Sequence, residues 1–168
     1  MAMIRPVNVE DASAQRTVRL EALRESPAAF GSTYVAEAQL AESEWIKRAT
    51  PDASGRSKSF LAFDGEVPCG IVRGSLDDPA TALVQSMWVA PGQRRLGVGR
   101  ELIEAVAEWA LARGVRTLKL MVTSNNQPAI RFYERLGFTM TGRVQPYPND
   151  PELVEYEMGK DLGTADGR

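Results

Sequence analysis

The chain has 168 residues, a net charge of −2 and 25% charged residues, which is the composition expected of one soluble globular domain. The charge balance argues against nucleic-acid or anionic-membrane partners, and no apolar run is long enough to cross a bilayer. The absence of histidine and the single cysteine, Cys69, exclude histidine triads, histidine metal sites and an internal disulfide. We therefore expect a cytoplasmic protein with no secretory signal and no metal site.

The first half of the chain is predicted to contain one strand, two helices and a hairpin. Residues 3–7 form the strand, and a helix capped by Asp11 or Ser13 runs to about Glu25, where Pro27 ends it. The second helix, over 41–49, turns three apolar side chains inward: Leu40, Trp45 and Ile46. Loops are expected at 28–34 and 50–58, followed by a hairpin of 59–63 with 67–73 and a turn over 74–80.

The second half alternates strands and helices. One strand is predicted at 84–89, and further strands are predicted at 117–122, 138–144 and 153–159, with a loop over 123–127. A long helix ends at Arg113 before Gly114, with apolar residues at helical spacing: Val98, Leu102, Val106, Trp109 and Ala110. A shorter helix covers 128–136. This order implies an α/β or α+β fold, with a mixed sheet and helices on both faces, in one domain over 1–162. Residues 163–168 are expected to be disordered.

The start of the long helix is predicted to bind an anion. Pro91 and Gly92 stop the preceding strand, while Gly97 and Gly99 would let a ligand approach the backbone. No Ser, Thr, Asp or Asn is placed to cap the first turn of this helix. Its free amide hydrogens and positive dipole end are therefore available to a phosphate.

Two other phosphate motifs do not fit this stretch. A P-loop requires a lysine after the glycines, and none follows. A dinucleotide fingerprint requires a third small residue where Leu102 stands, and the strand over 117–122 does not end in an acid. An ordinary strand-to-helix turn is the remaining alternative for the glycines considered alone.

Two separated motifs together resemble one family. The first is Arg94-Arg95-Leu96-Gly97-Val98-Gly99, which is similar to an Arg/Gln-x-x-Gly-x-Gly/Ala pyrophosphate loop. The second runs from Asn126 through Ala129 to the segment Tyr133-Glu134-Arg135-Leu136-Gly137-Phe138. In this order and context they resemble the GNAT superfamily of N-acetyltransferases, well over 59–160 and more loosely before it. The resemblance implies a mostly antiparallel sheet of six or seven strands, the GNAT-type acyl-CoA N-acyltransferase fold.

The resemblance also implies acetyl-CoA as co-substrate, held between the strands over 84–89 and 117–122. The diphosphate would lie on the amides of residues 95–100, and Asn126 would touch the pantetheine arm. The residues expected to bind the co-substrate are Met87, Trp88, Val89, Arg94, Arg95, Leu96, Gly97, Val98, Gly99, Arg100, Asn126, Ala129, Phe132 and Tyr133.

Tyr133 is the expected catalytic residue. Acetyl transfer to an amine requires a proton to leave the amine and another to reach the departing thiolate. A phenol is protonated at pH 7 and can donate to sulfur, the role that the resemblance assigns to Tyr133. The backbone amide of Val89 is the candidate donor to the developing oxyanion. Cys69 is expected to be structural, so direct attack in a ternary complex is favoured over an acetyl-cysteine intermediate.

The general base is not identified by the sequence. Leu83 stands where many relatives of this family carry a glutamate. Glu37, Glu155 and a water chain are the remaining routes for the proton, and an ordinary structural or solvent-facing role is an alternative for each glutamate.

The acceptor is expected to be a primary amine of a small molecule or peptide. Residues 30–34, the helix near Glu44 and Trp45, and the loop over 143–151 with Tyr147 would wall its site, and their acids and aromatic rings suit a cationic amine. A non-catalytic acyl-CoA sensor or scaffold is the alternative function, because of Leu83. The sequence leaves open which amine is used and whether the chain forms a homodimer.

Overall fold

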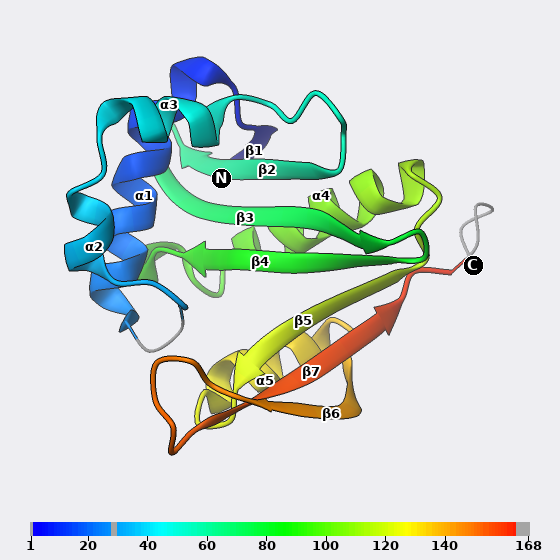
Figure 1. Cartoon of the computed structure of the whole chain (residues 1–168). Coiled ribbons are helices and arrows are strands. Elements are labelled where there is room, and N and C mark those ends of the chain that lie inside the picture. The colour runs from blue at the N-terminus through cyan, green and yellow to red at the C-terminus, as the bar shows by residue number, and fades with distance from the viewer. Residues whose placement is uncertain (1, 28–29, 164–168) are drawn as a thin grey trace.

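The computed structural model describes residues 2–27 and 30–163, which form one seven-stranded sheet flanked by helices (Figure 1). The strand order is β1-β2-β3-β4-β5-β7-β6, and every neighbouring pair is antiparallel except β4 with β5. The strands are β1 (Met3–Pro6), β2 (Ser57–Asp64), β3 (Val67–Asp78), β4 (Thr81–Val89), β5 (Thr117–Thr123), β6 (Thr139–Pro146) and β7 (Val154–Asp161). The predicted mixed, mostly antiparallel sheet is confirmed.

The helices lie on both faces of the sheet, as predicted. They are α1 (Ala12–Glu25), α2 (Tyr34–Ala38), α3 (Glu42–Ala49), α4 (Val98–Ala112) and α5 (Gln127–Arg135). Alternation along β2 separates two cores, because successive side chains point to opposite faces. Phe60 and Ala62 pack with α4 and α5, whereas Leu61 and Phe63 pack with α1 and α3. No described helix meets the length and hydropathy needed to cross a membrane.

Three expectations for the first half are wrong. The turn predicted over 74–80 belongs to β3, which continues to Asp78. Gly74 is needed there for close packing, since a Cβ at this position would lie 2.9 Å from both Trp109 Cζ3 and Val106 Cγ1 of α4. The short helix α2 was not predicted. Ile46 is 41% exposed, because Trp45 and Ala49 form the buried stripe of α3.

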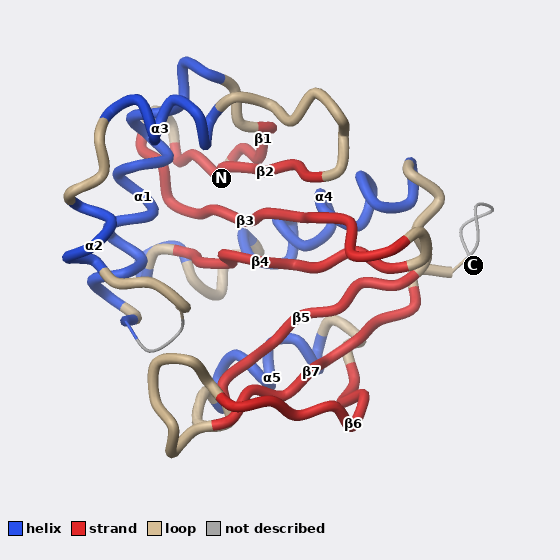
Figure 2. Tube along the Cα trace, in the orientation of Figure 1, coloured by secondary structure: helices blue, strands red, loops and turns tan. Residues whose placement is uncertain are grey.

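Strands β4 and β5 separate after a short parallel contact. Their pairing is confined to Thr81–Leu83 of β4 and Thr117–Lys119 of β5. A bulge then disturbs β4 where Ser86 has a positive φ of 55°. Beyond it the strands diverge, as Figure 2 shows. The tail predicted to be disordered lies outside the described residues, apart from Gly163, and so do residues 28 and 29 of the predicted loop.

Candidate active site

The first turn of α4 begins without a side-chain cap, as the sequence predicts. Gly97 is the N-cap residue in the left-handed conformation, with φ 88°, and no side chain bonds to the first amides. Nothing lies within 4 Å of a Cβ built on Gly97. Because the first amides of a helix have no partner within the helix, this turn presents free N–H groups to open space. Arg95, with φ 67°, and Arg100 are both exposed beside it.

Gly99 also makes room for an aromatic ring of α5. A Cβ there would lie 2.9 Å from Phe132 Cζ and 3.3 Å from Met87 Cε. The missing side chain therefore admits the ring of Phe132 against α4 and β4. This contact brings together three residues of the predicted site, Met87, Gly99 and Phe132. Among the remaining members, Val98 is buried, Leu96 is 67% exposed, and Ala129 is half-buried beside the core.

Arg94 contacts residues outside the first turn of α4. Its Nη2 lies 2.7 Å from Oε1 of Glu25 at the end of α1, and its Nε donates to the carbonyl of Val89 at 2.9 Å. Glu25 also accepts a hydrogen bond of 3.0 Å from Trp88 Nε1. The hydrogen bond from Arg94 lowers the pKa of Glu25 to about 2 against the opposing effect of burial, with Trp88 and Ser26 adding to it. Sequence analysis did not identify Glu25, which is 69 residues from Arg94.

The amide of Val89 faces the gap between β4 and β5. The amide of Ala90 donates to the carbonyl of Cys69 at 2.8 Å, so these two residues form a hydrogen-bonded pair. Pairs alternate along an antiparallel ladder, and the next pair, Gly70 with Val89, is therefore the non-bonded kind. The N–H of Val89 consequently points away from β3, toward the side where β4 and β5 diverge.

Tyr133 lies on α5 within the core beside this gap. It is 9% exposed, and its ring packs against those of Phe132 and Phe138 at centroid distances of 5.2 and 5.7 Å. Burial raises the pKa of its phenol above the usual value. The phenol is therefore protonated throughout the neutral range. The start of α5 is set by Asn126, whose side chain accepts a 3.3 Å hydrogen bond from the amide of Ala129, as the predicted polar residue before Pro128 suggests.

The two candidate bases have different surroundings. Glu37 is 4% exposed and receives hydrogen bonds from Arg19 at 2.9 and 3.0 Å and from Arg48 at 2.9 Å. Burial alone would raise the pKa of Glu37, but these arginines reverse the effect and lower it to about 2. Such a carboxylate holds three helices together, α2 with α1 and α3, and is a weak base. Glu155, opposite Thr123 in the sheet, accepts a 3.1 Å hydrogen bond from Gln145 Nε2.

Two other positions considered in the sequence analysis, Leu83 and Cys69, supply neither a base nor a reactive thiol. Leu83 is half-buried at the last pair of the β4–β5 contact, so no carboxylate is supplied from this position. Cys69 is 2% exposed on β3, and burial raises the pKa of its thiol. The expectation of a structural cysteine agrees with this environment. Among residues 2–27 and 30–163, no cluster of three carboxylate or thiol side chains could hold a metal ion.

The loops predicted to wall the acceptor side come together. Tyr147 and Asn149, between β6 and β7, both donate to the carbonyl of Phe30 at 2.8 Å. Tyr147 is 4% exposed, so its ring joins two loops rather than offering a free aromatic surface. These contacts connect the segment before α2 to the far edge of the sheet.

Comparisons with known proteins agree with this geometry. A model of the acetyltransferase (GNAT) family matches residues 20–138. A streptothricin acetyltransferase from Streptomyces lavendulae is 44% identical over 92 residues, which are 54% of this chain and 48% of that protein. The chain thus spans about half the length of the curated relatives it matches first.

Solved structures share the whole fold. An acetyltransferase of the GNAT family from Streptococcus pneumoniae superposes with a TM-score of 0.80 at 25% identity, covering 97% of this chain and 100% of that one. The Salmonella typhimurium protein yncA, solved with its cofactor acetyl-CoA, has a TM-score of 0.77 at 18% identity and covers 97% of this chain and 95% of its own. The second likeness concerns the fold alone.

Proposed function

Because the chain belongs to the GNAT family of acetyltransferases, we propose that it transfers an acetyl group from acetyl-CoA to a primary amine of a small molecule or peptide. The observation that carries this proposal is the divergence of β4 from β5 beside an uncapped helix start. The Val89 amide faces that gap, and the phenol of Tyr133 is kept protonated next to it.

The residues present suit the co-substrate. The free amides at the start of α4 would hold the diphosphate, with Arg95 and Arg100 as the exposed cations beside them. Arg94 would act on the same site indirectly, because it fixes the carbonyl of Val89, which lies on the same edge of β4 as the amide of this residue. The backbone of Met87, Trp88 and Val89 would pair with the pantetheine arm, and acetyl-CoA supplies a thioester to this gap.

Two groups of the chain have defined chemical tasks in this proposal. The Val89 N–H donates to the carbonyl oxygen as negative charge develops on it during attack by the amine nitrogen. The Tyr133 hydroxyl gives its proton to the sulfur as the carbon–sulfur bond breaks. The amine proton must leave separately, and Glu155 or a water chain are the routes that remain, since Glu37 is held by two arginines. We propose attack in a ternary complex, because the Cys69 thiol is buried and protonated.

Release of free thiol from acetyl-CoA, measured against a panel of primary amines, tests the proposal. We expect turnover that falls about 100-fold in Tyr133→Phe, within the range for loss of a general acid, while calorimetry still shows CoA binding. Replacement of Arg95 and Arg100 together by glutamate should abolish CoA binding, whereas Arg16→Glu, on the outer face of α1, should not. CoA binding without thiol release from any amine would favour the alternative function, a non-catalytic acyl-CoA sensor. That alternative is considered because Leu83 stands where many relatives carry a glutamate.

We also propose a cytoplasmic location, which rests on the single cysteine, Cys69. Cell fractionation with an antibody to the chain tests it. Recovery in a secreted fraction would contradict it.

A further inference from the structure

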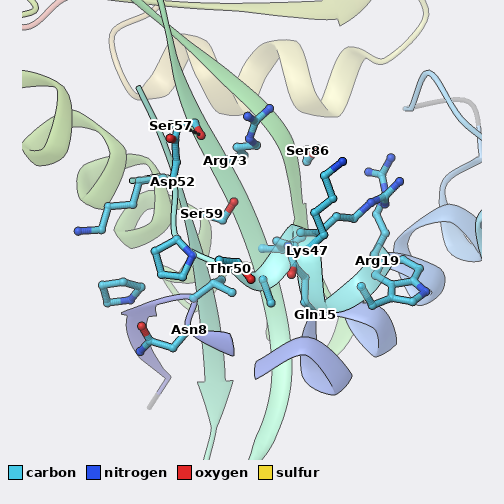
Figure 3. Close-up of a pocket in the computed structure, with 18 of the residues that line it drawn as sticks. Asn8, Gln15, Arg19, Lys47, Thr50, Asp52, Ser57, Ser59, Arg73 and Ser86 are labelled. Carbon is cyan, nitrogen blue, oxygen red and sulfur yellow. Dashed lines mark hydrogen bonds between the residues drawn. The ribbon is translucent and has the colours of Figure 1, made fainter. Parts of the chain in front are cut away.

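A cavity of about 940 Å³ lies on the sheet face that also carries α1 and α3 (Figure 3). Its floor is formed by strands β2, β3 and β4, which contribute Ser59, Arg73 and Ser86. Its walls come from α1, α3 and the segment that joins α3 to β2. The cavity is distinct from the first turn of α4, because Gly97 and its neighbours do not line it.

Basic side chains outnumber acidic ones around this cavity. Six basic residues line it: Arg19, Lys47, Arg48, Lys58, Arg73 and Arg113. The two acids are already engaged, since Glu44 pairs with Arg48 at 3.4 Å and Asp52 accepts hydrogen bonds from Ser54 and Ser57. The cavity therefore presents an excess of positive charge.

Of the six basic residues, only Arg19 and Arg48 form ion pairs among the described residues, and Arg113 donates to the carbonyl of Ser54. Lys47 and Arg73 are therefore two of the cations available to a ligand. Neither takes part in an ion pair among the described residues, and both side chains are exposed toward the cavity. Arg73 is positioned by a 3.3 Å hydrogen bond from its Nη1 to Gln85 Oε1, which leaves its other donors free. Figure 3 shows Lys47 and Arg73 reaching from different elements toward the region of Ser86. Such an arrangement fits a carboxylate.

One wall of the cavity also holds polar atoms without protein partners. Gln15 Oε1 and Trp45 Nε1 are buried without a hydrogen-bond partner in the described chain. Gln15 is 7% exposed and Trp45 2% exposed, and both residues line this cavity. Buried polar groups in folded proteins are nearly always paired, so the wall of the cavity contains two unsatisfied polar atoms.

The cavity and the proposed reaction centre lie along the same strand, β4. Ser86, at the bulge, lines the cavity, and Val89 is three residues further along the same strand. Three residues of strand span up to about 10 Å, and the bulge at Ser86 can only shorten this distance. An acceptor with one end beside Lys47 and Arg73 and the other beside Val89 would therefore have a comparable length.

We propose that this cavity binds the carboxylate of an acceptor whose amine lies about 10 Å away, the length of a peptide of about three residues. This inference rests on the proposed function, because it places the amine at the Val89 end. It narrows the acceptor from any amine to one with a remote negative charge. It also disfavours polycationic acceptors, which the basic cavity would repel.

Oligoglycines of one to four residues and their C-terminal amides test the proposal, since they vary the position of the carboxylate while keeping the same type of amine. We expect the lowest KM for triglycine and a KM at least 10-fold higher for its amide. Amidation of the carboxylate lowers the pKa of the amine, most strongly in glycine itself, and so leaves more of the amine unprotonated for attack. A preference for the acid over the amide therefore cannot come from amine reactivity. Arg73→Met and Lys47→Met should raise the KM for triglycine about 10-fold and leave the KM for the amide unchanged, and Arg16→Met should change neither.

Calorimetry with triglycine, in the presence of CoA, provides a readout independent of turnover. Triglycine binding by the wild type that is lost in Arg73→Met supports the carboxylate site. If this result is found but no acetyl transfer occurs, only the proposed function fails. Equal affinities for triglycine and its amide, with CoA binding intact, would overturn the carboxylate site and leave the proposed function standing.

Discussion

Removing the charge of Glu25 should destabilise the junction between α1, β4 and the loop before α4. This carboxylate accepts hydrogen bonds from Arg94 and Trp88, and Arg94 in turn donates to the carbonyl of Val89. Glu25→Gln keeps the shape of the side chain and removes its charge. We expect a lower free energy of unfolding and a less ordered Val89.

The magnitude follows from the pKa of Glu25. A decrease from 4.5 to about 2 corresponds to about 3 kcal/mol of preference for the charged form in the folded chain. Since about a third of the side chain is exposed (34%), solvent screening reduces the expected loss to about 1–2 kcal/mol at pH 7. The folded pKa is the lower one, so this stabilisation is complete above pH 4.5 and disappears as the pH falls toward 2.

Urea denaturation at pH 7 and at several lower pH values checks this expectation. The difference between wild type and Glu25→Gln should shrink steadily below pH 4.5. Glu21→Gln, an exposed position on the same helix, is the matched control and should show no such trend. A double-mutant cycle with Arg94→Gln should give a coupling energy of about 1 kcal/mol. Additive effects of the two substitutions, or a difference independent of pH, would refute the reasoning.

Three further predictions concern α4, α5 and the arginine-held glutamate. Tyr133→Phe should fold with near-wild-type stability, which urea denaturation checks. The wild type should show no loss of activity from phenol ionisation up to pH 10, because burial raises the pKa of Tyr133, and a pH–rate profile of thiol release checks this. Gly99→Ala should cost about 1–3 kcal/mol of unfolding free energy, because its Cβ would overlap Phe132, and Phe132→Leu should recover part of this loss in thermal melts. Gly97→Ala should instead cost about 1 kcal/mol through its left-handed backbone, with no rescue by Phe132→Leu. Glu37→Gln should lose about 3 kcal/mol of unfolding free energy at pH 7, because the contacts of Glu37 with two arginines are broken. This loss should vanish as the pH falls from 4.5 toward 2, and denaturant titrations that give equal losses at pH 7 and near pH 2 would contradict the prediction.

The parts of the site that depend on neighbours in sequence were predicted well. The uncapped start of α4 could be inferred because capping is decided within about four residues of Gly97. The role of Asn126 at the start of α5 is local for the same reason. The buried stripe of α4 followed from the spacing of Val98, Leu102 and Val106.

The parts that depend on packing were not predicted. Gly74 was expected in a turn, because glycine is common there, but it lies in β3 where a helix crosses closely. Arg94 was expected at the phosphate-binding turn, and its ion pair with Glu25, 69 residues away, was not predicted. No local pattern marks either contact, since each joins residues from distant elements.

The amino-acid sequence by itself determined most of the elements, their order, the free amide end of the long helix and the position of Tyr133 on a helix two elements later. These features arise from periodicity, caps and glycines acting over a few residues. Only the tertiary structure decided which arginine remains available to an anion, that β4 and β5 part after Leu83, and that six basic side chains surround one cavity. Those outcomes depend on how α1, α3 and α4 cross the sheet, which is settled by packing between residues far apart in the chain.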